Sequence, residues 1–490
     1  MQAMGLTAAT FVARLIGLVG SFVLAGLLGP AAMGPWSTLR ALLGYGNLNH
    51  LGALEAYRRE HPRLMAQDDP TEAQRVEDAA LGAAWLGSLA TSLAGAIAAT
   101  TIALLAPQSV VARHLQPILA LCATVVPITL GTFWNERLGV RRRFGPMARL
   151  RALRGLAYAV CLPLGALAHG LVGTAIALWI AETQMTLTTR RLSLASDGRC
   201  SPRLDLRRIA ALVGVGFPIT FAWWTVIVQD GLDRIAALSV LGGENAGHYA
   251  IAVLIASCVF LLPEAISRVL APDLCAAGAA KGGTRDVEDR VDRVADALAL
   301  WLPFATGIGA VFVEPFLASF LPRYVEAADP ARILLLGASF AALVPGGIDL
   351  LVATDRSRRL MLVGPLAIGA RLGLCAVGAV AAGGPAGVAM GAVASNLVFV
   401  ALLGVAAHRV RTTRRFVLRM VPTCVVGAAY LTVENVFVGA VANWSTALPC
   451  ALLVPLLALA VLGVIPRHGG AIGAILARLR RRRGVERAAA

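Results

Sequence analysis

The chain has 490 residues, of which 58% are hydrophobic and only 15% are charged. Soluble globular proteins are roughly half apolar and about a quarter charged, so this composition excludes a disordered chain, a disulfide scaffold and a typical soluble enzyme. Basic residues outnumber acidic ones by 44 to 28, which gives a net charge of +16. They lie in short clusters between apolar runs and form no continuous basic face, so we expect no nucleic-acid partner. The sequence predicts a polytopic membrane protein.

A membrane-spanning helix needs about 20 mostly apolar residues. Fourteen such runs are found, at 5–28, 34–55, 79–106, 116–137, 150–168, 171–189, 209–234, 246–267, 297–318, 332–353, 360–381, 386–407, 418–441 and 445–465. The first run shows no pattern of a cleavable signal peptide, so we expect it to be the first transmembrane helix. Residues 281–296 carry alternating charges at helical spacing and are predicted to form an amphipathic surface helix.

Arginine and lysine predict the orientation, because they concentrate in the cytoplasmic loops of membrane proteins. With the N-terminus inside, the predicted cytoplasmic segments hold 37 of these residues, and the outer loops hold Arg113, Arg323 and Arg332. We therefore expect a multi-pass protein of the bacterial cytoplasmic membrane, with both termini in the cytoplasm.

Two stretches of the first half recur in the second half. Residues 28–36 and 241–249 both read Leu-Gly, four residues, Gly, one residue and an aromatic, at an offset of 213. Residues 168–175 and 382–389 match at an offset of 214. Six spans separate the copies, so both halves have the same orientation, as in transporters that bind substrate between two parallel repeats. The predicted units are an N-terminal six-helix bundle at 1–205, a second bundle at 206–410, two further transmembrane helices at 411–466 and a basic cytoplasmic tail at 467–490.

Several short patterns along the whole chain carry a family resemblance. They are Leu28-Gly29-Pro30 through Gly34, Leu51-Gly52, Gly216-Phe217-Pro218, Asp233-Arg234, Leu241-Gly242 through Gly247-His248-Tyr249, Pro263 and Pro272. With these the chain resembles the multidrug/oligosaccharidyl-lipid/polysaccharide (MOP) exporter superfamily, particularly its polysaccharide repeat-unit flippase branch.

The resemblance implies an all-α membrane protein of about 14 transmembrane helices. Two parallel six-helix bundles would form a V like that of the MATE transporters, with two extra C-terminal helices. It also implies a flippase, not an enzyme, that moves polyprenyl-pyrophosphate-linked oligosaccharide to the outer leaflet by alternating access, without a cofactor. The implied partners are this lipid-linked oligosaccharide, membrane lipids, and polysaccharide polymerase and assembly proteins.

Charged residues inside spans are functional candidates, because they are expensive to place in lipid. Helical spacing groups such residues on one face of each of three spans. The first span carries Thr7, Thr10, Arg14, Gly17 and Ser21 on one face. The second carries Arg40, Gly44, Asn47 and His50, and the seventh carries Thr220, Trp223, Ile227, Asp230 and Arg234, with Asp233 beside it. The eleventh span holds Arg371.

The planar guanidinium group of arginine can bind two phosphate oxygens at once, and hydroxyl, amide and aromatic groups suit a sugar. We therefore expect a substrate cavity lined by Arg14, Arg40, Asn47, His50, Asp230, Asp233, Arg234 and Arg371. The alternative is that each arginine only pairs with a carboxylate or with helix carbonyls inside a bundle, and Asp230 could pair with Arg234 in this way. Glu182 and Glu434 are candidates for ion coupling, although packing within a bundle is the competing interpretation.

Missing motifs narrow the mechanism. The lone lysine, Lys281, is followed by glycine and belongs to no P-loop, and no metal-binding spacing of histidine or cysteine is found. Energy would come from an ion gradient, the membrane potential or the substrate's own gradient. Three alternatives stay open: a MATE-type drug or cation antiporter, a lipid-linked peptidoglycan precursor flippase, and a membrane-embedded polysaccharide polymerase or ligase. The last usually needs a large outer loop, and no predicted loop is long enough.

Overall fold

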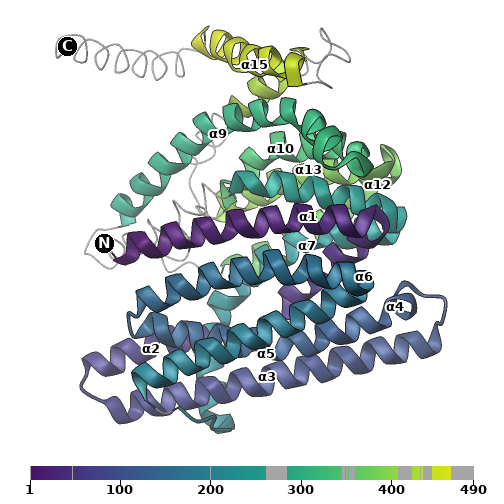
Figure 1. Cartoon of the computed structure of the whole chain (residues 1–490). Helices are drawn as coiled ribbons and strands as arrows, with labels where there is room; N and C mark the ends of the chain where they lie inside the picture. Colours follow the sequence, from purple (N-terminus) through teal and green to yellow (C-terminus); the bar gives the residue numbers. More distant parts are fainter. Residues whose placement is uncertain are drawn as a thin grey trace, which may run out of the picture.

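The structure is a computed structural model that describes residues 2–46, 48–198, 200–260, 284–344, 348, 351, 359–406, 422–430, 432–433 and 444–464. Its helices are α1 (Gln2–Gly46), α2 (Ala53–Ala66), α3 (Pro70–Leu105), α4 (Val110–Arg113), α5 (Leu115–Val140), α6 (Phe144–Asp197), α7 (Leu206–Ser257), α9 (Thr284–Phe320), α10 (Ala328–Ala341), α12 (Leu360–Ala381), α13 (Gly384–Ala406) and α15 (Trp444–Val464), with 3-10 turns η1 (Cys258–Phe260) and η2 (Pro322–Ala327) (Figure 1). All regular structure in these ranges is helical, as predicted.

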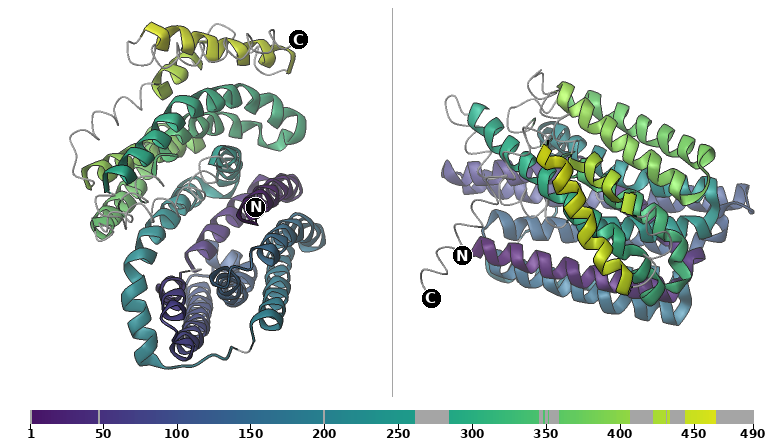
Figure 2. Two further views of the ribbon diagram at one scale, coloured as in Figure 1. Left: turned by 90° about the vertical axis from the view of Figure 1, so that its left-hand side faces the viewer. Right: turned by 90° about the horizontal axis from the view of Figure 1, so that it is seen from above.

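Seven helices in the described ranges are long and apolar enough to cross a membrane. They are Thr10–Gly46, Pro70–Leu105, Leu115–Val140, Phe144–Ala195, Ala295–Phe320, Leu360–Ala381 and Gly384–Ala406. Large apolar side chains on these helices face outward, with Leu105 and Val380 exposing 81% and 79% of their surface. Such surfaces suit lipid and not water. The long helices share one general direction (Figure 2), which confirms a polytopic membrane protein.

Three of the longest helices contain a break in helical geometry. The backbone is non-helical at Gly29 in α1, at His169 and Gly170 in α6 and at Gly242 in α7. Each break lies at a predicted hairpin between two spans and divides its helix into two arms. In α6 the arms fold against each other, because a Cβ added to Gly165 would collide with the backbone of Gly173. The positions of these turns are confirmed, while the total of fourteen spans and the twelve-plus-two arrangement stay predictions.

The glycines of the first repeat pair share one conformation and contact each other. Gly29 has φ 72° and ψ 170°, and Gly242 has φ 82° and ψ 178°, values that side chains other than glycine rarely allow. Five residues further on, Gly34 packs on the carbonyl of Gly243, and its counterpart Gly247 packs on the carbonyl of Pro30. Exchanging the two halves maps one contact onto the other. This reciprocity is the signature of a two-fold relation between the repeats.

The largest apolar cluster joins the two halves at these hairpins. It includes Leu24 of α1, Tyr249 of α7 and Leu317 of α9. Tyr324 of η2 belongs to it and donates a hydrogen bond of 2.9 Å from its hydroxyl to the carbonyl of Ala25. The halves are therefore closed against each other on the side that the arginine distribution predicts to be outside.

Two predicted boundaries were wrong. The second span, predicted at 34–55, ends with α1 at Gly46, and residues 53–55 belong to the separate helix α2. The chain turns between them at Leu51 and Gly52, which have φ 47° and 99°, and an apolar scan cannot detect such a turn inside a hydrophobic run. The helix predicted at 281–296 is not separate, because its residues from Thr284 onward continue without interruption into α9.

The C-terminal helices pack on the second half. Val426 and Val454 of this region share an apolar cluster with Ala310 and Val311 of α9. In Figures 1 and 2, α15 lies at the edge of the molecule beyond α9, away from α1 and α6.

Candidate functional site

The second arm of α1 and the first arm of α7 run antiparallel along the boundary between the two halves. The Tyr45 hydroxyl donates to the carbonyl of Val228 at 2.8 Å, and the Thr38 hydroxyl donates to the carbonyl of Arg234 at 3.2 Å. Gly231 lies directly under Tyr45 and leaves no room for a side chain. This close packing brings Arg40 of the first half towards Arg234 of the second half.

Arg40 lies in an aromatic and charged environment. Its guanidinium carbon is 6.0 Å from the centre of the Trp36 ring and 5.7 Å from that of Tyr158 on α6. Within α6, the carboxylate of Glu182 on the second arm accepts a hydrogen bond of 3.0 Å from Arg154 on the first arm. Arg40 lies within electrostatic range of Glu182, Arg154 and Arg234. Arg234 in turn lies within electrostatic range of Asp230. The boundary therefore gathers three arginines and two carboxylates, with aromatic rings beside Arg40.

Asp233 and Arg371 form a buried ion pair in the second half. The Arg371 guanidinium donates to Asp233 at 2.8 Å, and the Tyr249 hydroxyl donates to the same carboxylate oxygen at 2.8 Å. Arg371 also donates to the carbonyl of Ala392 and to the hydroxyl of Ser395, both at 2.8 Å, and to the Asn396 side chain at 3.0 Å. Both charged side chains are almost fully buried. These contacts favour a role in holding α7, α12 and α13 together.

Asp230 and Arg234 occupy the same arm of α7. Asp230 is exposed and Arg234 is half-buried, and in the part of the chain that the structure describes no ion pair joins them. The i,i+4 pairing considered from the sequence is therefore not formed; Asp233 pairs across the bundle with Arg371 instead. Asp230 lies within electrostatic range of Arg371 and Arg234.

The first arm of α1 presents the predicted polar face. Arg14 is exposed, and a Cβ added to Gly17, one turn further, would meet no atom within 4 Å. Thr10 on this face accepts a hydrogen bond of 2.8 Å from Arg151 of α6. The face thus borders open space and carries basic groups from two helices.

The predicted site residue His50 lies away from this boundary. His50 is buried in the turn between α1 and α2, where its Nδ1 accepts the backbone N–H of Gly52 at 3.2 Å. This contact ties the turn together and gives His50 a local structural role. Asn47 and Glu434 lie outside the described residues.

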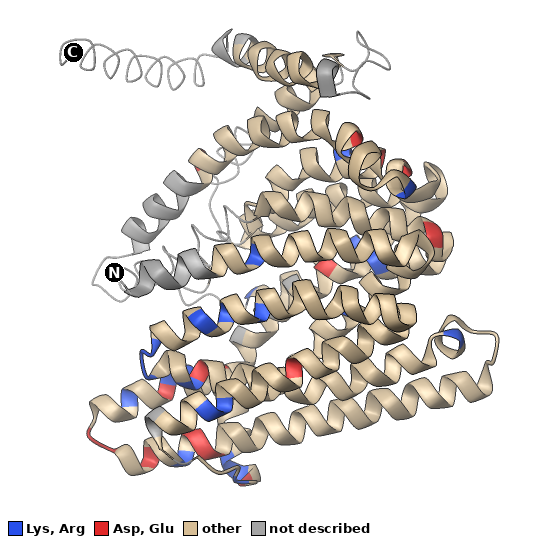
Figure 3. Ribbon diagram, viewed as in Figure 1, with Lys and Arg blue, Asp and Glu red and all other residues tan. Residues whose placement is uncertain are grey.

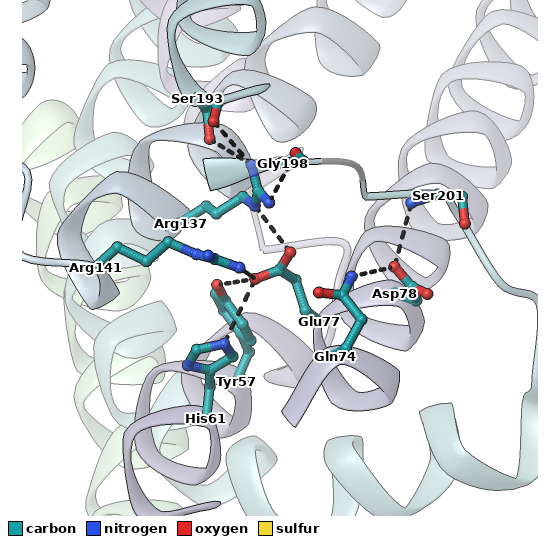
Figure 4. A network of polar contacts seen from close by, with 10 residues as sticks. All are labelled: Tyr57, His61, Gln74, Glu77, Asp78, Arg137, Arg141, Ser193, Gly198 and Ser201. Atoms are coloured by element: carbon teal, nitrogen blue, oxygen red, sulfur yellow. Dashed lines mark hydrogen bonds and ion pairs between the residues drawn. The ribbon is translucent and has the colours of Figure 1, made fainter. Parts of the chain in front are cut away.

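A buried polar network escaped the sequence analysis (Figure 4). Glu77 of α3 and Arg137 of α5 expose none of their side-chain surface and are joined at 2.8 Å. Glu77 also accepts from Arg141 at 2.9 Å and from the Tyr57 hydroxyl at 3.2 Å. Arg137 further donates to Ser193 of α6 at 3.0 and 3.1 Å and to the carbonyl of Gly198. The network fastens four helices at the end of the molecule where charges of both signs gather (left in Figure 3).

The link between the two halves is fixed at the same place. Ser201 donates its backbone N–H to the Asp78 carboxylate at 3.2 Å, and the N–H of Arg203 donates to the Asp78 carbonyl at 3.1 Å. Gly82 of α3 packs directly on the backbone of Arg203. In the sequence, only the acids Glu77 and Asp78, directly before the third apolar run, could have pointed to these contacts.

Comparison with known proteins identifies the fold. No family model matches the chain, and neither does any curated protein sequence. Among solved structures, the lipid II flippase MurJ in an inward closed conformation matches with a TM-score of 0.70 at 12% identity, covering 94% of this chain and 98% of that chain. An inward-facing multidrug resistance MATE family transporter of the MOP superfamily matches with a TM-score of 0.67 at 14% identity, over 82% and 95% of the two chains.

An outward-facing MATE structure fits less well. Its TM-score is 0.57 at 16% identity, over 84% of this chain and 96% of that chain. The chain therefore has the fold of these MATE and MurJ structures, which confirms the predicted all-α, MATE-like membrane fold. At these identities the likeness identifies the fold alone.

Proposed function

We propose that the protein is a flippase that moves polyprenyl-pyrophosphate-linked oligosaccharide from the inner to the outer leaflet of the bacterial cytoplasmic membrane, for surface polysaccharide synthesis. The observation that supports this proposal is the excess of arginine at the boundary between the halves, where Arg40 and Arg154 lie beside Glu182 and Arg234 lies near Arg40 and Asp230. A pyrophosphate that enters a low-dielectric space needs such neutralisation. The rings of Trp36 and Tyr158 beside Arg40 offer faces on which a sugar could stack.

The pairing of Arg154 with Glu182 suggests how binding of the substrate to Arg154 could be coupled to binding of a proton to Glu182. Glu182 is 2% exposed and holds Arg154 at 3.0 Å. A pyrophosphate would draw Arg154 away, and protonation of Glu182 would release the same arginine. In this scheme Glu182 is the coupling group, and a proton gradient favours loading on one side of the membrane. Asp230, exposed on the α7 arm, offers a polar group for the glycan hydroxyls.

The contacts between the hairpins suggest how access would alternate. The outer side is closed by Gly34 on Gly243, by Gly247 on Pro30, and by the bond from Tyr324 to Ala25. Opening outward requires all three contacts to separate, while the buried networks at Glu77 and at Asp233 keep each half rigid. The two halves then rock as bodies around the arginine cluster. Arg371, paired with Asp233, belongs to this rigid framework.

A second candidate is translocation of a lipid-linked peptidoglycan precursor. It is favoured by the likeness to MurJ, which extends over 94% of this chain and so includes the C-terminal helices. The arginine cluster suits the pyrophosphate of either substrate. A drug or cation antiporter fits less well, because the arginines at the boundary (Arg40, Arg154 and Arg234) outnumber the nearby acids Glu182 and Asp230 and would repel a cationic substrate.

Reconstituted proteoliposomes test the proposal. The purified chain is given a fluorescent polyprenyl-pyrophosphate oligosaccharide, a lipid-linked peptidoglycan precursor or a cationic dye, and appearance of each on the far side is followed. We expect translocation of the oligosaccharide lipid. Movement of the precursor alone would favour the second candidate, and movement of the dye alone would contradict both. A matched pair of variants, Arg14→Ala and Arg14→Lys, tests the α1 face, and we expect the lysine variant to retain part of the activity.

A further inference from the structure

A pocket of about 400 Å³ lies between α2, α3 and α5, next to the Glu77 network and apart from the boundary arginines. Its walls include His61, Met65, Pro70, Gln74, Arg141 and Arg142. The pocket lies on one half alone, at the end of the helices that the arginine distribution predicts to be cytoplasmic. It therefore has no part in the translocation scheme above.

The pocket is electropositive. Arg141 and Arg142 contribute two guanidinium groups, and no acidic residue lines it. The nearest acid of the network, Glu77, exposes none of its side chain and is neutralised by Arg137 and Arg141. An anion in the pocket would meet positive charge without facing a competing exposed carboxylate.

His61 supplies a buried polar atom that lacks a partner. Its side chain is 7% exposed, and its Nε2 lies 3.6 Å from Glu77 (Figure 4). In the described part of the chain its Nδ1 has no hydrogen-bond partner. Buried polar groups are nearly always satisfied, and leaving one unsatisfied is unfavourable. His61 lines the basic pocket, so this unpartnered nitrogen is a candidate ligand for an oxygen bound there.

We propose that this pocket binds a phosphoryl anion, with the guanidinium groups of Arg141 and Arg142 and the Nδ1 of His61 as its ligands. The apolar side chains of Met65 and Pro70 would contact the carbon skeleton attached to the phosphate. The phosphoryl group belongs either to the head group of an anionic lipid at the cytoplasmic surface or to a soluble phosphorylated metabolite. Arginine suits a phosphoryl ligand because its planar guanidinium group can donate hydrogen bonds to two phosphate oxygens at once.

Binding should take up one proton. The Nε2 of His61 faces the carboxylate of Glu77 and therefore carries hydrogen, which leaves Nδ1 as an acceptor in the neutral ring. Burial holds the pKa of His61 below its ordinary value, so the free ring is neutral at pH 7. A phosphate oxygen can bind Nδ1 only if a proton lies between them. The charged and titratable groups around the ring are Glu77 of α3, Arg137 and Arg141 of α5 and Tyr57 of α2, and none of them supplies this proton.

The test uses the full-length protein and two probes. Isothermal titration with glycerol 3-phosphate represents the soluble source, and native mass spectrometry with phosphatidylglycerol or phosphatidylcholine represents the lipid source. The test variant is Arg142→Asn, because Arg142 has φ 57° and asparagine tolerates this left-handed conformation while removing the charge. The matched control is Arg59→Asn, an exposed arginine of α2 that does not line the pocket. Thermal unfolding of both variants verifies that they are folded.

We expect one probe to bind and thereby identify the source: glycerol 3-phosphate for a metabolite, or phosphatidylglycerol in preference to phosphatidylcholine for a lipid. Arg142→Asn should weaken that binding at least tenfold, and Arg59→Asn should leave it unchanged. Between pH 7 and pH 9 the affinity should fall by about tenfold per pH unit, as uptake of one proton requires. The proposal is overturned if neither probe binds, if both variants weaken binding equally, or if the affinity does not change with pH. None of these outcomes depends on whether the protein is a flippase.

Discussion

Replacing Glu77 with alanine is expected to destabilise the protein by about 3–5 kcal/mol, the effect of removing one partner from a buried ion pair. Glu77 and Arg137 expose none of their side-chain surface and are joined at 2.8 Å. The variant keeps the Arg137 guanidinium buried but removes the carboxylate that neutralises it. Arg141 and Tyr57 lose their contacts at 2.9 and 3.2 Å in the same step. The damage should therefore exceed that of any exposed ion pair on α3.

The measurement is thermal or denaturant unfolding of the purified protein in detergent. Glu72→Ala is the matched control, since Glu72 lies on the same helix, pairs with Arg75 and Arg208 and is 33% exposed. Exposed pairs contribute about 0–1 kcal/mol, so this variant should unfold almost like the original. A double variant, Glu77→Leu with Arg137→Met, should recover part of the loss because no buried charge is left without its partner. Equal stability of Glu77→Ala and Glu72→Ala would refute the buried network.

Three further predictions follow from the geometry between and within the halves. Asp233→Asn is expected to destabilise the protein by about 3–5 kcal/mol and so to lower the amount of folded protein in the membrane, and adding Arg371→Met should restore part of that amount. A quantitative blot measures the abundance, and normal abundance of Asp233→Asn would disprove a structural pair. Gly34→Leu should hold the hairpins apart, because a side chain there collides with the opposite backbone. Spin-label distances between the outer ends of the two halves should increase, and unchanged distances would count against the contact. Reporter fusions should place Arg142 in the cytoplasm and Asn245 outside, and a cytoplasmic Asn245 would remove the predicted parallel repeat.

The turns between spans could be predicted because they leave a local signal. Gly29 and Gly242 have positive φ, which favours glycine at those positions, and so the repeat was visible in the sequence. Leu51-Gly52 was expected to close the second span, but the apolar run continues past it to residue 55, because the turn depends on close packing of Gly52 against Gly216 of another helix. Hydropathy reports lipid exposure but not where a helix bends.

The partners of charged residues could not be predicted. Asp233 and Arg371 were both identified as candidates, but they are 138 positions apart, and the helical spacing instead suggested Asp230 with Arg234. Glu77 and Arg137 were overlooked because each lies at the end of an apolar run, where a charge is usually solvated. Their burial depends on α2 and on the link after α6, which cover them. Only the docking of separate segments distinguishes a buried charge from a loop charge.

The central claim is that the arginine cluster between the halves binds the pyrophosphate of the substrate. The most direct measurement is the initial rate at which Arg40→Gln moves a fluorescent polyprenyl-pyrophosphate oligosaccharide in proteoliposomes, beside the original protein and the surface control Arg59→Gln. Hydrogen bonds to charged groups contribute about 1.5–3 kcal/mol, so we expect the translocation rate of Arg40→Gln to be at least about tenfold lower. The rate of Arg59→Gln should be unchanged. If Arg40→Gln translocates the lipid as fast as the original protein, this cluster is not the substrate site.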